Sequence, residues 1–76
     1  MANLKTFSIE DLAEFFVNEI VRARRFGPLP GYDEDLWDEA QSRTDREEFV
    51  RLVKSEFDAE GLEWSADQPF TAEPKE

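Results

Sequence analysis

The 76-residue chain contains no cysteine and no histidine. Without cysteine it can form neither a disulfide bond nor a thiolate metal site, which is compatible with a reducing compartment. Without histidine it lacks the commonest general base and the commonest zinc ligand. Small domains often depend on such staples. We therefore expect the stability of this one to come from helix packing, aromatic contacts or association with another chain.

Long apolar runs are also missing, since the longest one covers only residues 15–17. A secretory leader or a membrane-crossing helix needs a much longer apolar stretch. We therefore expect a cytoplasmic protein that makes no membrane contact. At this length there is room for a single domain with a small core.

Motifs that carry catalysis or bind cofactors are absent as well. The sequence has no glycine-rich phosphate loop and no G-x-S-x-G motif, and its serines have no histidine to activate them. The segment Asp33-Glu-Asp35 has the spacing with which a calcium-binding EF-hand loop begins. The sixth and twelfth positions of that loop would hold Asp38 and Thr44, where glycine and glutamate are needed. We expect no enzymatic activity, no bound metal and no cofactor.

Basic residues are scarce: nine stand against nineteen acidic residues, for a formal charge of −10. Such a charge repels nucleic acid and anionic lipid and attracts basic surfaces. Residues 33–43 are the most acidic part, with five acidic residues and one arginine. The arginines at 22, 24 and 25 could contact nucleic acid, but the net charge opposes this and a role at the helix end is the plainer interpretation.

The strongest helical pattern covers residues 9–26. Ser8 stands at the N-cap position, where its side chain can accept a hydrogen bond from the Asp11 amide, and Gly27 is suited to end the helix. Apolar residues occupy a sector of about 240° around this helix, whereas an ordinary surface helix needs only about 100° or more. We therefore expect neighbours on two sides, either two helices of the same chain or one of them and a partner.

Two shorter helical patterns follow. The first covers residues 34–43, with Asp33 as the expected cap and a narrow apolar stripe that includes Trp37. The second covers residues 45–60 and follows a capping-box pattern from Thr44 to Glu47. Together with residues 9–26, these patterns predict an all-α fold, a small three-helix bundle.

No helical period continues beyond Glu63, and Trp64 and Phe70 are the only large apolar side chains in this last part. We expect residues 1–62 to form a single helical domain. Residues 63–76 are predicted to form an extended acidic C-terminal arm that packs partly through Trp64.

The acidic residues of the second and third helices form a candidate partner-binding surface, with Trp37 as its aromatic anchor. We expect a protein partner with a basic surface and no direct contact with nucleic acid. If that partner binds nucleic acid, the protein would be an inhibitor that imitates the charge of DNA, which carries one negative charge per roughly 1.7 Å. The alternative is a solvated acidic face with Trp37 buried in the core. The candidate residues are Asp33, Glu34, Asp35, Trp37, Asp38, Glu39, Glu47 and Glu48.

A second hypothesis uses the wide apolar face of the first helix as the interface of a homodimer. Phe15, Val21 and Phe26 would line this interface, and the acidic surface would only keep the protein soluble. Arg24 falls inside the apolar sector of the same helix, where we expect it to form a structural ion pair with Glu56.

Overall fold

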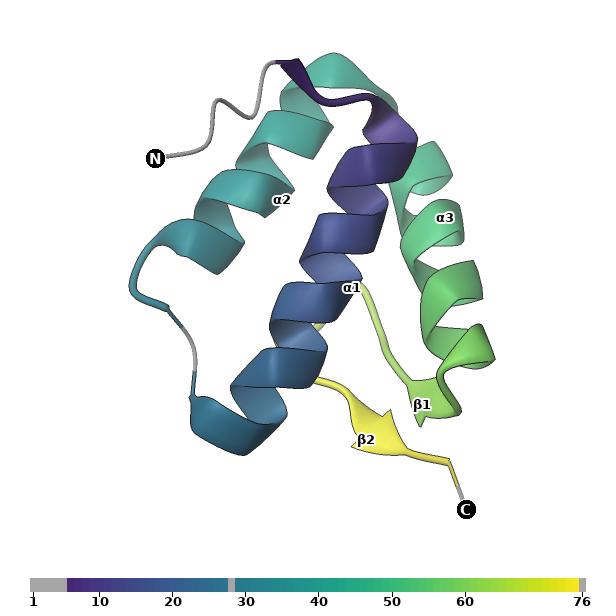
Figure 1. Ribbon diagram of the computed structural model, residues 1–76. Helices are drawn as coiled ribbons and strands as arrows, with labels where there is room; N and C mark the ends of the chain where they lie inside the picture. Colours follow the sequence, from purple (N-terminus) through teal and green to yellow (C-terminus); the bar gives the residue numbers. More distant parts are fainter. Residues whose placement is uncertain (1–5, 28, 76) are drawn as a thin grey trace.

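The computed structural model describes residues 6–27 and 29–75. Residues 1–5 of the predicted helical domain and residue 76 of the predicted C-terminal arm therefore lie outside the described residues. Three helices account for most of the described chain, and two short strands follow them (Figure 1). The predicted all-α three-helix fold is confirmed. The elements are α1 (Ile9–Phe26), α2 (Tyr32–Arg43), α3 (Arg46–Ala59), β1 (Leu62–Glu63) and β2 (Glu73–Pro74).

Both ends of α1 have the predicted caps. The Asp11 amide donates a hydrogen bond of 3.1 Å to Oγ of Ser8, which stands at the N-cap. At the other end Gly27 has φ = +88°, and its N–H donates to the carbonyl of Ala23 at 2.9 Å. Glycine adopts this positive φ at no steric cost, so the chain can leave the helix there.

The predicted cap of α2 is wrong. The helix begins at Tyr32, after Gly31 with φ = +78°, and no side chain caps it. Asp33 lies inside the first turn of the helix instead, and it is buried. Gly31, in the left-handed conformation, allows a sharp change of direction before the helix. The helix can therefore begin at Tyr32, whereas a cap at Asp33 would make residue 34 its first residue.

The predicted cap of α3 is also wrong by one residue. Asp45 holds the N-cap position, while Thr44 ends α2 by donating its N–H to the carbonyl of Ala40 at 3.1 Å. The Thr44 hydroxyl donates to a carboxylate oxygen of Glu48 at 3.2 Å. Because only two residues separate the helices, Thr44 is used to close the first of them.

The width of the apolar sector of α1 is explained by two neighbours in the same chain. This helix packs against both α2 and α3, whereas α2 and α3 make fewer contacts with each other. The core lies between the three helices. Its fully buried large side chains are Leu12, Phe16, Ile20, Leu36, Phe49, Val53 and Phe57.

Residues 62–75, here called the C-terminal loop, fold back on themselves after α3. Strands β1 and β2 pair antiparallel, with Leu62 opposite Pro74. Within the loop, Nε1 of Trp64 donates to the carbonyl of Pro69 at 2.8 Å. Trp64 itself is buried in the core. The arm has more structure than the sequence indicates, since the strand pairing closes it into a loop.

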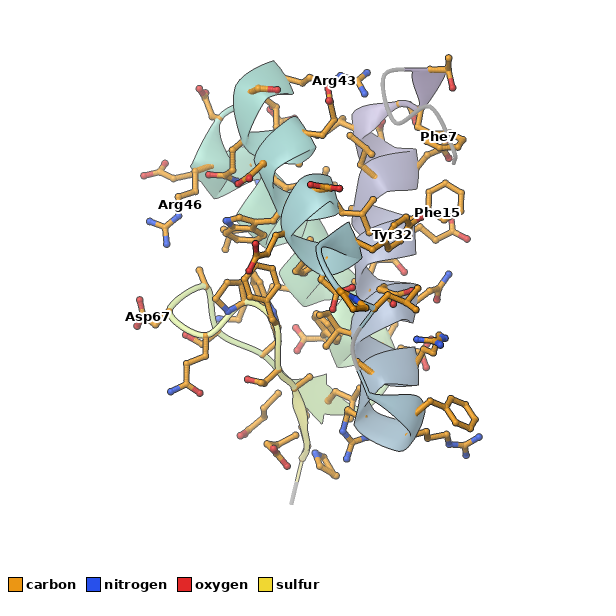
Figure 2. The ribbon with its side chains drawn as sticks, turned by 90° about the vertical axis from the view of Figure 1, so that its left-hand side faces the viewer. Phe7, Phe15, Tyr32, Arg43, Arg46 and Asp67 are labelled. Atoms are coloured by element: carbon orange, nitrogen blue, oxygen red, sulfur yellow. The ribbon has the colours of Figure 1, made fainter. Side chains whose placement is uncertain are left out.

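The C-terminal loop and α1 lie on opposite sides of the molecule. In Figure 2 the loop, marked by Asp67, projects on one side of the helices, while Phe15 of α1 projects on the other. From its side the loop reaches the core through Phe70, whose ring centroid is 6.1 Å from that of Phe16. The loop therefore helps to cover the inner face of α1 and leaves its outer face open.

Candidate functional site

The acidic surface that the sequence predicts is smaller in the structure than expected. Five of its carboxylate residues are exposed, on α2 and in the first turn of α3. Exposed carboxylates retain their hydration and charge, and they can act on a partner at a distance. We use the name acidic surface for these five residues: Glu34, Asp35, Asp38, Glu47 and Glu48.

Trp37 does not serve as an exposed anchor for this surface. It is half-buried, and its ring lies 5.4 Å from that of Phe16 and 5.6 Å from that of Phe49, measured between centroids. A third ring, that of Trp64, is 6.1 Å away. These distances are typical of aromatic pairs in cores. Trp37 therefore holds α2 onto the bundle, as the alternative interpretation expected.

Glu39 is only partly available for recognition. It is half-buried, and Oε2 of its carboxylate lies 3.9 Å from Nε of Arg43 on the next turn of α2. This ion pair offsets the charge of Glu39 locally. We therefore leave Glu39 out of the acidic surface.

Asp33 is not a surface residue at all. Its exposed fraction is 4%, and within the described part of the chain neither of its carboxylate oxygens has a hydrogen-bond partner. Burial, and after it repulsion by Glu19, raises the pKa of Asp33 to about 6, while the positive charge of Arg22 opposes the rise. A proton on Asp33 would allow its hydroxyl to donate to Glu19, which relieves both the repulsion and the missing hydrogen bond.

Glu19 of α1 is the second member of this buried carboxyl pair, and it was not among the residues predicted from the sequence. It is also buried, and its Oε1 lies 3.4 Å from a guanidinium nitrogen of Arg22. The same nitrogen donates to the carbonyl of Gly27 at 3.3 Å. A signal was present, because Glu19 falls three residues after Phe16 and four before Ala23, on the apolar side of the helix.

The predicted ion pair between Arg24 and Glu56 does not form. Both residues are exposed, and neither takes part in an ion pair within 4.0 Å among residues 6–27 and 29–75. Arg24 instead lines a hollow with Ala72 and Glu73. Residues of the C-terminal loop thus lie beside Arg24, on the side of α1 where Glu56 was predicted.

The predicted dimer residues have unequal exposure. Phe15 is 39% exposed and Phe26 is 75% exposed, whereas Val21 is half-buried against the core. The ring of Phe7 lies 4.8 Å from that of Phe15, and both rings are on the outer side of α1 in Figure 2. Leu29, 41% exposed, follows α1 in the chain. All the exposed large hydrophobic residues of the described chain thus belong to α1 or to the connector after it.

A hollow of about 460 Å³ lies between α3 and the C-terminal loop. Asp58 and Lys75 line it, and Nζ of Lys75 donates to Asp58 Oδ1 at 2.8 Å. This hydrogen bond lowers the pKa of Asp58. A carboxylate with a lowered pKa is a weak proton acceptor, so Asp58 is poorly suited to act as a general base.

Metal sites and membrane-crossing helices are two further features to consider in the described residues. No group of three or more acidic side chains there has an arrangement that could hold a metal ion. No helix in those residues has the length and apolar character needed to cross a membrane. Comparison with protein-family models, with curated protein sequences and with solved structures finds no match to this chain.

Proposed function

We propose that this protein is a non-enzymatic binding protein that contacts a basic surface of another protein through its acidic surface. The observation that carries the proposal is the exposure of all five residues of that surface. Residues 34–48 contain seven acidic residues and two arginines, a net charge of −5. A surface of this kind speeds the encounter with a basic partner and disfavours acidic ones.

The acidic residues are also spread out. They begin in the first turn of α2 and continue into the first turn of α3. The 12 residues of α2 alone span about 18 Å at 1.5 Å per residue. Nucleic acid likewise carries its negative charge spread along its length. We therefore propose a nucleic-acid-binding protein as the partner, from whose basic surface this protein would exclude nucleic acid.

The test is a pull-down from native lysate with the wild-type protein and two matched variants. Asp35→Lys combined with Asp38→Lys reverses the charge on α2, and Glu63→Lys combined with Asp67→Lys makes the same change outside the acidic surface. We expect basic proteins to be retained by the wild type and by the second variant only. Retention should fall at high salt, because exposed charges are screened beyond about 8 Å at physiological salt.

Two results would contradict the proposal. Equal retention by both variants would mean that the acidic surface only keeps the protein soluble. Retained proteins that DNA duplex fails to displace would exclude competition with nucleic acid while leaving a basic partner in place. Circular dichroism of each variant shows that its helices are intact.

A second candidate function is self-association through the outer face of α1. The observation that favours it is the location of the exposed Phe15 and Phe26 on this helix, with Leu29 next to it. Large apolar side chains left on one side of a small protein often mark an interaction site. Sedimentation equilibrium at micromolar concentration should then show a dimer that Phe15→Glu dissociates, and a monomer at every concentration would exclude this function.

A further inference from the structure

The outer face of α1 carries a regular stripe of exposed side chains. Asp11, Phe15, Asn18, Arg22 and Arg25 follow one another at spacings of four and three residues. This is the spacing that keeps side chains on one line along a helix. Glu14 lies beside the line, four residues before Asn18. We call these six residues the outward stripe.

The outward stripe is partly open in the described chain. The ring of Phe7 lies 4.8 Å from that of Phe15, and Glu60 and Leu62 line a hollow with the C-terminal half of the stripe. The fully buried residues Leu12, Phe16 and Ile20 face α2, α3 and the C-terminal loop, on the opposite side of the same helix. In Figure 2 the labelled Phe15 points away from the other helices. Arg22 keeps 41% of its side chain exposed, although it contacts Glu19 and Gly27.

The charges of the stripe are ordered along the helix. Asp11 and Glu14 lie in the N-terminal half, and Arg22 and Arg25 lie in the C-terminal half. Two acids and two arginines give the stripe no net charge, in a chain whose formal charge is −10. Among the described residues, Asp11, Glu14 and Arg25 form no ion pair within 4.0 Å. Their charges are therefore free to meet a complementary surface.

A second copy of the stripe is such a surface, provided that it runs in the opposite direction. In a parallel pair of α1 helices like charges would face each other, whereas an antiparallel pair brings each acid to an arginine. With the two-fold axis at Asn18, Asp11 of one copy faces Arg25 of the other, and Glu14 faces Arg22. A two-fold contact makes each of these pairs twice, which gives four ion pairs around the axis.

The apolar side chains match the same register. Phe15 of one copy lies at the same level along the axis as the half-buried Val21 of the other, on each side of the short Asn18 side chains at the axis. Helices pack at interaxial distances of about 8–10 Å, and small side chains at the crossing point permit the closer end of this range. The 18 residues of α1 provide about 27 Å of helix for the contact.

We propose that two copies of this chain associate through their outward stripes, α1 against α1 and antiparallel, around a two-fold axis at Asn18. The inference rests on the second candidate function above and adds its orientation and register. The occupant of the exposed face is thus a second copy of the chain. The reason is that the charge order of the stripe complements itself.

The orientation is tested with single-cysteine variants. Because the chain has no cysteine of its own, each introduced cysteine can form a disulfide only with a cysteine of another copy. Under mild oxidation Asn18→Cys should form a disulfide-linked dimer. Asp11→Cys and Arg25→Cys should each stay monomeric on a non-reducing gel, because equivalent residues would lie about 21 Å apart along the axis. A mixture of these two variants should form a heterodimer, and Glu47→Cys, exposed on α3, serves as the control that does not cross-link.

The charge pairing is tested by reversal and rescue. Asp11→Arg and Arg25→Glu should each weaken the dimer by about tenfold or more in Kd, since each places like charges opposite one another twice. The double variant with both changes restores opposite charges and the original net charge, and its Kd should return close to that of the wild type. Glu47→Arg changes the net charge as Asp11→Arg does, away from the stripe, and should have little effect.

The outcomes separate the orientation from self-association itself. A wild-type protein that stays monomeric at every concentration overturns both. A monomer that binds a different protein, and releases it when Phe15→Glu is introduced, overturns both as well. A dimer in which Asp11→Cys and Arg25→Cys each cross-link to themselves is parallel and overturns the proposed orientation only. A dimer without cross-linking at Asn18→Cys, or without rescue in the double variant, overturns the register while self-association stands.

Discussion

Phe15 and Phe16 are neighbours in the chain, yet they belong to two different sides of α1. Phe16 is fully buried and contacts four other aromatic rings, whereas Phe15 is 39% exposed and lies against Phe7. The inner side is closed by two helices and the C-terminal loop, whereas the outer side stays partly exposed, with Phe7 beside Phe15. The comparison shows that the aromatic content of this protein exceeds what its own core uses.

The largest expected effect is the difference between truncating these two residues. Phe16→Ala should lower the free energy of unfolding by about 3–5 kcal/mol, because it removes a buried ring from the centre of the core. Phe15→Ala should lower it by less than about 1 kcal/mol in the monomer. Urea unfolding at low protein concentration measures both. Similar losses for the two variants would show that the outer side of α1 is covered after all.

The buried Asp33 is a weak point of the inner side, and Asp33→Asn should stabilise the protein at neutral pH. The pKa of Asp33 rises from 3.8 to about 6 in the fold, so the folded state binds the proton more tightly than the unfolded state. Stability is therefore lost as pH rises from about 4 to about 6, and above this range the loss amounts to at most about 3 kcal/mol. Asparagine carries no such charge and can donate to Glu19.

The measurement is urea unfolding of Asp33→Asn and wild type at pH 7.5 and pH 4. We expect the variant to be more stable at pH 7.5 and the difference to shrink towards pH 4. Asp35→Asn is the control, since it makes the same change at an exposed position of the same helix. If Asp33→Asn raises the free energy of unfolding equally at both pH values, ionisation of Asp33 is not the cause of the increase.

Trp64→Phe, also on the inner side of α1, should lower the free energy of unfolding by a smaller amount. It keeps an aromatic ring against Phe57, where the centroids are 5.6 Å apart and the planes nearly parallel, but it removes the hydrogen bond to Pro69. An unsatisfied buried carbonyl costs about 1–3 kcal/mol, and solvent near the loop should keep the loss at the lower end. Thermal unfolding checks this value, and a loss as large as that of Phe16→Ala would mean that the whole loop detaches.

The smallest loss in the free energy of unfolding is expected for Lys75→Ala, at the edge of the inner side. The ion pair between Lys75 and Asp58 is short, at 2.8 Å, but both side chains are about half exposed. Exposed ion pairs make only a small contribution to stability and are screened by salt. Urea unfolding in low and high salt should show a small loss only in low salt. A larger loss would indicate that this pair closes the C-terminal loop.

Local signals in the sequence were sufficient for much of this architecture. The three helices follow from apolar periodicity, and the ends of α1 follow from Ser8 and Gly27, whose effects depend only on residues within one turn. The packing of Trp64 could be predicted because few other large apolar groups follow α3. These features required no knowledge of how distant segments meet.

The errors arose where distant segments compete for the same residue. Asp33 has the side chain of a helix cap, but the contact of α2 with α1 places it against Glu19 in the interior. Arg24 has the helical position of a partner for Glu56, but the C-terminal loop returns along that side of α1. Of the predicted acidic surface, Trp37 and Asp33 were lost to the core for the same reason.

The closure of the C-terminal loop also has a consequence for the order of events during synthesis. Phe16 and Trp37 each have two ring partners, Trp64 and Phe70, that follow α3 in the chain. A ribosome adds roughly 5–20 residues per second, so all three helices can form before these partners emerge. Until Trp64 and Phe70 have emerged from the ribosome, the nascent bundle lacks these partners and exposes part of its aromatic core.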